Sequence, residues 1–272
     1  MSRDHAAETR EAREPLSCSS VLAGGGTLYA ATMGSGIYRK REEHRWERIS
    51  TPEMDGLTVN RLVLAGERLH ACTSRGLYIF DGEEWETEEL ELPVFQYRAE
   101  GGCLYACTTH GLWCSHGADW GSAAFADRKV YDIVNVPQYL ILGCEKGLAL
   151  YDRFSSAWME FDLGAGVTSV AVCHGRLIGV SELGELVVGT PQHGFERYRY
   201  PGLFLFSIAV RGGQPLLCSD RGLYRAAWLG GRIALRPVET TGPVTDVDAS
   251  GERLYLATLY EGIRQLDGML PG

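Results

Sequence analysis

Seven polar or charged side chains recur at the same place along the chain, each shortly before a leucine that opens an apolar run. They are Ser20, Arg61, Gln96, Asp132, Ser169, Ser207 and Asp246, the one in the sixth segment being displaced by one residue. The flanking positions are mostly apolar, as at Val59, Val130, Val167 and Val244. A polar residue held between apolar ones at seven equivalent places predicts a polar ring around a ligand-filled or water-filled opening.

A second set of charges stands in turns, each one residue before a recurring glycine except Glu182, which is two before. This set is Arg75, His110, Lys146, Glu182, Arg221 and Glu261. Carboxylate and imidazole groups transfer protons, so the candidates for acid–base catalysis are Asp132, Asp246 and His110. Spacing does not show that these three are within reach of one another. Catalysis, contact with a ligand or partner, and a merely solvated channel therefore stay open.

These positions repeat because the chain itself repeats. An apolar strand, a turn closed by glycine and a second apolar strand return seven times, with 35 to 41 residues between equivalent leucines. The leucines are Leu28, Leu69, Leu104, Leu140, Leu177, Leu216 and Leu254, and the glycines are Gly36, Gly76, Gly111, Gly147, Gly184, Gly222 and Gly262. Residues 57–92 contain four strand-like runs (TVNRLVL, RLHACT, LYIF and WETEEL) separated by turns. A fixed period of this size indicates a repeat architecture.

Four-stranded sheets stacked around a ring cover one another's faces and leave only short edges, which is the β-propeller arrangement. The sequence therefore predicts an all-β fold, a single seven-bladed propeller of four-stranded antiparallel blades over residues 1–272. The seventh repeat stops after three strands. We expect residues from about Glu8 to Leu16, within the polar segment 1–16, to supply its outer strand and close the ring. The first strand of each blade would line a central channel, with both polar sets at one mouth.

Recurring aromatic residues predict packing between blades. Trp46, Trp85, Trp120 and Trp158 open the fourth strands, and Phe195 and Ile233 fill the same place in the next two repeats. The segment YRYPGLFLFSIAV, residues 198–210, is unusually apolar for the entry to a first strand. Its side chains, which include Phe204, cannot all face inward on an alternating strand. They form either an apolar binding patch near the channel or a loop folded over the blade.

The segment GLTVNRLVLAGERLHACTSRGLYIFDGEEW resembles the propeller repeats in the sensor regions of two-component regulators. The matching residues are Gly56, Leu57, Asn60, Thr73, Gly76, Leu77 and Tyr78, with weaker copies at 104–113, 142–152 and 217–224. The resemblance covers most of the chain at the level of repeats. It implies a propeller fold more than an activity. In those regulators the propeller is attached to membrane and kinase segments.

Composition narrows the partners. The formal net charge is -9 over 272 residues, which argues against nucleic acid, because its binding depends on clustered Lys and Arg. No apolar run approaches the roughly 18 residues of a membrane span, and the polar N-terminus lacks a secretory signal, so we expect a cytoplasmic protein without a membrane partner. The eight cysteines predict buried thiols and no metal site. No cofactor fingerprint is present, and none is expected.

Three functions fit these observations. The first is a non-enzymatic propeller that binds a protein or peptide partner at the channel-mouth face. The residues predicted to make that contact are Arg61, Gln96, Asp132, Ser169, Ser207, Asp246, Arg75, Lys146, Arg221 and Phe204. The second is a small-molecule-binding protein or a lyase- or isomerase-like enzyme with its pocket at the same mouth. The third is a structural unit of a larger assembly.

Overall fold

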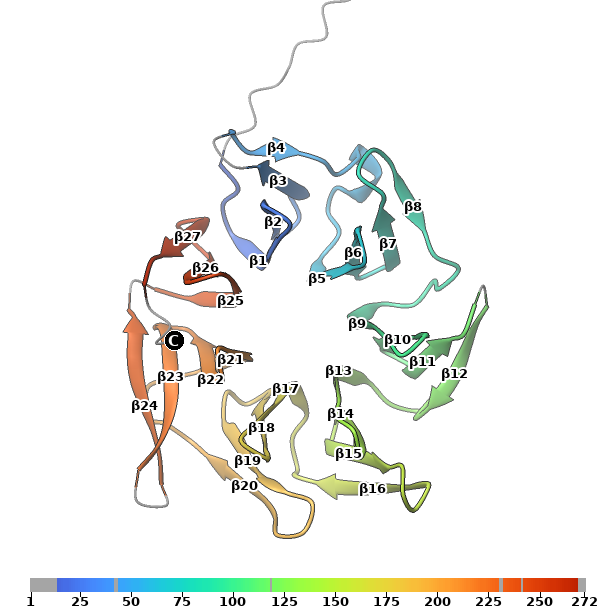
Figure 1. Cartoon of the computed structure of the whole chain (residues 1–272), viewed down its shortest axis with the longest axis vertical. Coiled ribbons are helices and arrows are strands. Elements are labelled where there is room, and N and C mark those ends of the chain that lie inside the picture. Colours follow the sequence, from blue (N-terminus) through green and yellow to red (C-terminus); the bar gives the residue numbers. More distant parts are fainter. Residues whose placement is uncertain (1–13, 42–43, 118, 230–231, 241, 269–272) are drawn as a thin grey trace, which may run out of the picture.

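A computed structural model describes residues 14–41, 44–117, 119–229, 232–240 and 242–268. Within these ranges the chain forms 27 strands and one 3-10 helix, η1 (Pro52–Met54). The strands make seven separate antiparallel sheets, arranged as blades around a central channel (Figure 1). The prediction of an all-β, seven-bladed propeller is confirmed.

Each blade is a meander whose first strand is innermost. The inner strands are β1 (Cys18–Gly24), β5 (Val59–Ala65), β9 (Val94–Glu100), β13 (Val130–Asn135), β17 (Val167–Cys173), β21 (Leu205–Arg211) and β25 (Val244–Ser250). The second strands are β2 (Thr27–Thr32), β6 (Arg68–Thr73), β10 (Cys103–Thr108), β14 (Tyr139–Cys144), β18 (Arg176–Ser181), β22 (Gln214–Ser219) and β26 (Arg253–Thr258). The third strands are β3 (Ile37–Arg41), β7 (Gly76–Phe80), β11 (Gly111–Ser115), β15 (Gly147–Asp152), β19 (Leu186–Thr190), β23 (Gly222–Leu229) and β27 (Ile263–Leu266). The outer strands are β4 (Glu47–Arg48), β8 (Trp85–Thr87), β12 (Trp120–Ala124), β16 (Ala157–Asp162), β20 (Gly194–Tyr198) and β24 (Arg232–Glu239).

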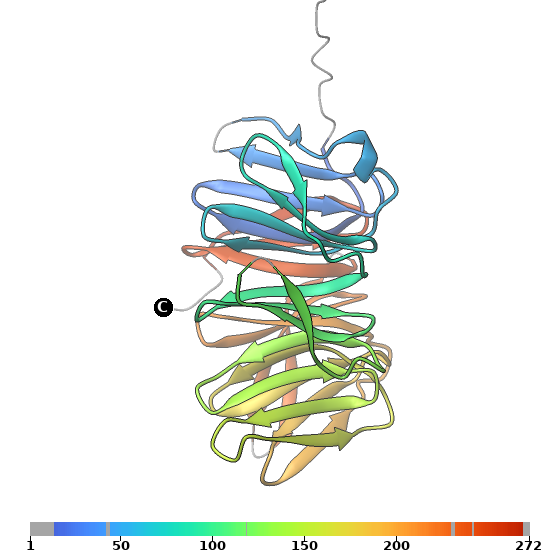
Figure 2. The ribbon, with the colours of Figure 1, turned by 90° about the vertical axis from the view of Figure 1, so that its right-hand side faces the viewer.

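The strands cross the thickness of the ring, so each turn lies on one of two faces (Figure 2). We call the face at which the inner strands begin the entry face. It also carries the turns between second and third strands, because strands in a meander alternate in direction. The face at which the inner strands end is called the exit face.

Every inner strand carries an irregularity in its pairing with the second strand, and it falls at the same place in all seven blades. One extra residue is inserted there, as in a β-bulge, which re-aims the neighbouring side chains. The extra residues are Ser19, Asn60, Phe95, Tyr131, Thr168, Phe206 and Thr245. In three blades the inserted side chain donates a hydrogen bond to the next blade. Ser19 Oγ bonds to Val59 O (2.8 Å), Asn60 Nδ2 to Val94 O (2.7 Å) and Thr245 Oγ1 to Cys18 O (2.8 Å).

The recurring aromatic residues pack between blades, as predicted. Trp85 Nε1 donates to Ile49 O of the preceding blade at 2.7 Å, and Trp120 Nε1 donates to Glu88 Oε2 at 3.0 Å. The rings of Trp158 and Phe125 meet edge to face with 4.8 Å between centroids. Trp85 and Trp120 therefore cover apolar surface while their indole N–H groups keep a partner.

All eight cysteines are free, and six are buried. Burial raises the pKa of Cys18, Cys144 and Cys218 to about 12, because a thiolate is disfavoured away from water. These cysteines pack as small apolar side chains, as predicted.

The last blade has three strands, β25, β26 and β27, in the described residues. Pro15 lies against this blade: a Cβ at Gly262 would collide with the Pro15 carbonyl. In four earlier blades the matching glycine approaches a carbonyl at the end of the outer strand or just beyond it, such as Leu90 O for Gly76 and Glu239 O for Gly222. Residues 14–16 are not in a strand, and the rest of the predicted closing strand lies outside the described residues. Closure by this segment stays a prediction.

Candidate functional site

The seven polar positions predicted from the repeats lie at one level of the channel, and we call them the polar layer. Five of them, Ser20, Asp132, Ser169, Ser207 and Asp246, are buried. They stand next to the inserted bulge residues and below the entry face. The polar layer is therefore an internal feature of the channel rather than an exposed rim.

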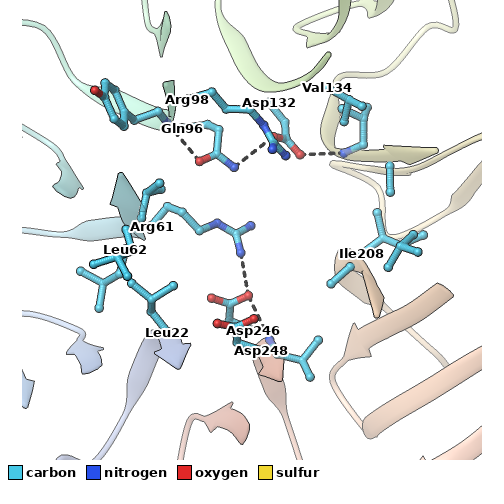
Figure 3. A pocket seen from close by; sticks show the side chains of 18 of the residues that line it. Leu22, Arg61, Leu62, Gln96, Arg98, Asp132, Val134, Ile208, Asp246 and Asp248 are labelled. Atoms are coloured by element: carbon cyan, nitrogen blue, oxygen red, sulfur yellow. Dashed lines mark hydrogen bonds and ion pairs between the residues drawn. The ribbon is translucent and has the colours of Figure 1, made fainter. Parts of the chain in front are cut away.

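Asp246 is the most heavily bonded member of the polar layer. Its Oδ1 accepts from Arg61 Nη1 at 2.6 Å and from Val247 N at 2.9 Å, and its Oδ2 accepts from Ser20 Oγ at 2.7 Å and Val21 N at 3.2 Å. Arg61 belongs to the second blade and Asp246 to the seventh, so the ion pair passes across the first blade (Figure 3). The charge of Asp246, above all, raises the pKa of Arg61. The guanidinium is therefore permanently charged.

On the other side of the channel, Asp132 of the fourth blade accepts hydrogen bonds from the third and fifth blades. Its Oδ1 accepts from Gln96 Nε2 at 3.2 Å and Ile133 N at 2.8 Å, while Oδ2 accepts from Val170 N at 2.8 Å. The serines act similarly: Ser20 Oγ accepts from Leu62 N, and Ser169 Oγ accepts from Ile208 N, both at 3.2 Å. Most residues of the polar layer thus form hydrogen bonds between neighbouring blades.

The three predicted acid–base candidates do not meet. Asp132 and Asp246 come from the fourth and seventh blades and share no hydrogen bond in the described part of the chain. His110 is exposed in a turn of the entry face, where its Nδ1 lies 3.0 Å from Thr109 Oγ1. It does not line the channel cavity.

A cavity of about 450 Å³ extends from the polar layer toward the exit face. Arg61, Gln96, Asp132 and Asp246 lie at its inner end. Figure 3 shows the Arg61 side chain reaching into the middle of the channel. Nearer the exit face the lining includes Leu64, Arg98, Glu100, Arg211 and Asp248. The sequence led us to predict the opening at the entry face. The spacing of residues does not show on which side of the polar layer space remains.

The entry face carries a group of aromatic side chains that we call the aromatic arc: Phe95, Tyr131, Phe204 and Phe206. Three of them are inserted bulge residues. The centroids of Phe95 and Tyr131 are 5.1 Å apart, and those of Phe204 and Phe206 are 5.7 Å apart. Burial, then the charge of Glu182, raises the pKa of Tyr131. Tyr131 and Phe204 approach the fifth blade from either side, at Gly166 and Gly184.

Exposed apolar side chains are concentrated on the entry face. Seven large apolar residues are exposed in the described chain, and five lie there: Leu16, Met33, Leu183, Phe204 and Tyr260. Met33 N donates to Ser17 O at 2.8 Å and Ser17 Oγ donates to Leu259 O at 2.9 Å, which brings Leu16, Met33 and Tyr260 together across the joint between the last and first blades. Sequence reasoning missed Met33, Leu183 and Tyr260. The available signal was that these turns carry an apolar residue where other repeats carry a polar one.

The apolar segment 198–206 divides between core and surface. Tyr198, Tyr200 and Leu203 pack on the core of the fifth and sixth blades. Phe204 is held outward, since its backbone N–H donates to Asp220 Oδ1 at 2.9 Å. The segment is therefore partly folded over the blade and partly exposed, and a binding role for Phe204 stays a prediction.

Three predicted contact residues, Arg75, Lys146 and Arg221, are exposed in the turns of the entry face. They make no ion pair within the part of the chain that the structure describes. Two acidic side chains of the same face each accept a backbone hydrogen bond, Glu182 Oε1 from Gly166 N and Asp220 Oδ1 from Phe204 N, both at 2.9 Å. The entry face therefore presents unpaired cations around apolar side chains.

Among the described residues, no group of three or more His, Cys, Asp or Glu side chains is arranged to hold a metal ion. No helix in that part of the chain is long and apolar enough for a membrane span.

No family model matches the chain, and no curated protein matches its sequence. Solved structures match its fold. The extracellular domain of the putative one-component system BT4673 from B. thetaiotaomicron superposes with a TM-score of 0.75 at 16% identity, over 92% of this chain and 38% of that one. The chain thus spans under two fifths of that structure. The WD40 propeller domain of Doa1 gives a TM-score of 0.71 at 13% identity, over 93% of each chain. YCF48 gives 0.68 at 13% identity, also over 93% of each.

These comparisons show the fold. A related extracellular domain, of the putative hybrid two-component system BT3049, is also similar, with a TM-score of 0.72 at 13% identity. The resemblance to propellers of two-component regulators is therefore confirmed at the level of fold. The cytoplasmic location stays a prediction.

Proposed function

We propose that this chain is a protein-binding propeller whose entry face holds a peptide segment with apolar anchor side chains next to carboxylates. The observation that carries the proposal is that five of the seven exposed large apolar side chains of the described chain lie on one face. Leu16, Met33 and Tyr260 lie at the joint between the last and first blades, and Leu183 and Phe204 lie at the fifth and sixth blades. Exposed apolar side chains gathered on one face are typical of an interaction surface.

The chemistry of the partner follows from the charges. Arg75, Lys146 and Arg221 offer guanidinium and ammonium donors around the aromatic arc. Arginine in particular pairs with carboxylates through two parallel hydrogen bonds. An acidic segment with aromatic or aliphatic anchors would match both features.

Structural neighbours support partner binding in general. YCF48 was solved bound to D1 peptide, and another neighbour is a chain of the mitotic checkpoint complex, with a TM-score of 0.68 at 12% identity. An enzyme with its pocket at the entry mouth has less support, because Asp132 and Asp246 are taken up by backbone amides and do not meet.

Selection from a library of displayed random peptides tests the proposal. We expect the enriched peptides to combine Phe, Tyr or Leu with Asp or Glu, and Phe204→Ala to weaken their binding at least about tenfold, as expected for an aromatic hot spot. Phe154→Ala is the matched control, because Phe154 is 84% exposed in the turn between β15 and β16, on the exit side.

A second comparison tests the charge complementarity. Replacing Arg75, Lys146 and Arg221 together by alanine should weaken binding of the same peptides and reduce its dependence on salt. Peptides that bind the Phe204 variant and the triple variant as tightly as the unchanged protein would refute the proposal.

A further inference from the structure

The cavity on the exit side of the polar layer is separate from the entry face. Its lining starts at Arg61, Gln96, Asp132 and Asp246, and it includes neither the inserted bulge residues nor the turns of the entry face. Whatever occupies it therefore contacts a different set of residues from the proposed peptide. The groups that are still free to bind at its inner end indicate the class of ligand.

Arg61 has donors to spare. Its Nη1 bonds to Asp246, while its Nε and Nη2 make no hydrogen bond within the described residues. The side chain remains 26% exposed, and Figure 3 shows it projecting into the channel from β5. A guanidinium presents five N–H donors in a fork that matches a carboxylate.

The carboxylates at the same depth have few free acceptor sites. Asp246 accepts four hydrogen bonds and Asp132 accepts three, against about four acceptor sites on a carboxylate. A cation would have to displace backbone amides to reach them. The unused binding capacity at the inner end of the cavity is therefore that of a donor, and the fitting ligand carries an acceptor.

Arg98 adds a second donor nearer the exit face. Its Nε donates to Ile133 O at 2.8 Å, and the residue is exposed. Arg211, in contrast, is paired with Asp248 at 2.7 Å. Because the carboxylates of Asp132, Asp246, Asp248 and Glu100 also line the cavity, a dianion such as phosphate would meet more repulsion than a single negative charge.

Aliphatic side chains form part of the walls. Figure 3 shows Leu22, Leu62, Val134 and Ile208 around the space, and the charged lining residues nearer the exit face are Arg98, Glu100, Arg211 and Asp248. The hydrocarbon part of a ligand held at Arg61 would be shielded from water where it lies against the aliphatic side chains. A cavity of about 450 Å³ is within the size range of small-molecule sites.

We infer that this cavity binds a small aliphatic monocarboxylate, with its carboxylate on the free donors of Arg61 and its hydrocarbon part along the leucine and valine walls. The site lies on the opposite side of the polar layer from the proposed peptide surface. It stands on its own observations.

Hexanoate is the probe, and hexanamide is its neutral counterpart. Calorimetry with the whole chain should give saturable binding of hexanoate with a dissociation constant of about 1 mM or lower, which is reasonable for a ligand of about eight heavy atoms. Hexanamide and inorganic phosphate should bind at least about tenfold more weakly. Equal binding of hexanamide, tighter binding of phosphate, or no saturation by about 10 mM hexanoate would overturn the inference.

Two further measurements locate the site. In protein labelled with ¹⁵N-arginine, hexanoate should shift the Nε–H signal of Arg61 and leave that of Arg75, on the entry face, unchanged. The double variant Arg61→Gln with Asp246→Asn, which removes both charges of the pair, should weaken hexanoate at least tenfold. If the double variant does not fold, the Arg61 signal in the unchanged protein decides. An unmoved Arg61 signal at saturation would refute the assignment.

Discussion

At the scale of single residues, the ion pair between Arg61 and Asp246 combines two environments. Asp246 is buried with a full set of donors, whereas Arg61 keeps part of its side chain open to the cavity. A buried charge that loses its partner is costly, while a partly exposed one is screened by solvent. The two members of the pair therefore contribute unequally to stability.

Substitution of the two buried aspartates, of which only Asp246 forms an ion pair in the described chain, tests what the ion pair contributes to stability. Asp246→Asn should lower the free energy of unfolding by about 3 kcal/mol, because it removes the ion pair and disturbs hydrogen bonds among three blades. Asp132→Asn should cost about 1 to 2 kcal/mol, since Asp132 accepts hydrogen bonds but makes no ion pair in the described chain. Urea unfolding followed by tryptophan fluorescence measures both. Equal losses would mean that the ion pair adds nothing.

At the scale of strands and blades, the joint between the second and third blades contains a buried histidine. His70, on β6, is 4% exposed and stacks on Tyr97 of β9, with 4.4 Å between ring centroids and 13° between planes. Its Nδ1 lies 3.2 Å from Arg68 O, so Nδ1 carries the proton that is donated to this carbonyl. Burial lowers the pKa of His70, against the weaker opposing effects of the Arg68 carbonyl and Glu88.

The lowered pKa gives the joint a predictable dependence on pH. As the pH falls below about 6.5, the unfolded chain takes up a proton at His70 before the folded chain does. The contribution of His70 is thus present above that pH and is lost below it, by at most about 1.4 kcal/mol for each pH unit. Urea unfolding between about pH 7.5 and 5 should show this loss. It should be smaller in His70→Phe and unchanged in His110→Gln, which alters an exposed turn. The same pH dependence in the His70 variant would contradict the prediction.

The strands also show how far the sequence could predict this molecule. Recurring glycines and leucines mark local turns and strands, so the blades and the level of the polar layer followed from their spacing. The inserted residue of each bulge, such as Tyr131, depends on pairing between two strands, which spacing does not report. The bonds from Asp132 to Val170 and from Asp246 to Ser20 join distant segments, and the side of the layer on which space remains depends on all seven blades. Local patterns carry none of this information.

At the scale of the whole molecule, the two faces of the ring differ in chemistry. The entry face has the aromatic arc, exposed apolar turns and unpaired cations, while the exit face opens into a cavity with Arg61 at its inner end. Closure of the ring requires contact between the last and first blades. Pro15 and Ser17 contact the last blade at Gly262 and Leu259.

Truncation tests the predicted closing strand. Removal of residues 1–13 should lower the melting temperature by several degrees, because the edge of β27 would lose a ladder of hydrogen bonds. Removal of 269–272 at the other terminus is the control and should have a smaller effect. Calorimetric scans of both variants measure the difference. A truncated chain that melts with the unchanged protein would show that residues 1–13 do not close the ring.

Bulge residues make the same kind of hydrogen bond between the last and first blades as between consecutive blades. The bond from Thr245 to Cys18 O, which links the last blade to the first, is of the same kind and length as the bond from Ser19 to Val59 O between two blades that follow each other in the chain. The last and first blades are far apart in the sequence, but at this point they are joined by the same type of hydrogen bond as neighbouring blades elsewhere in the ring. These bonds therefore depend on which blades are neighbours in the ring and not on which blade comes first in the sequence. A circularly permuted gene, with its start in another blade, would encode all of the same joints.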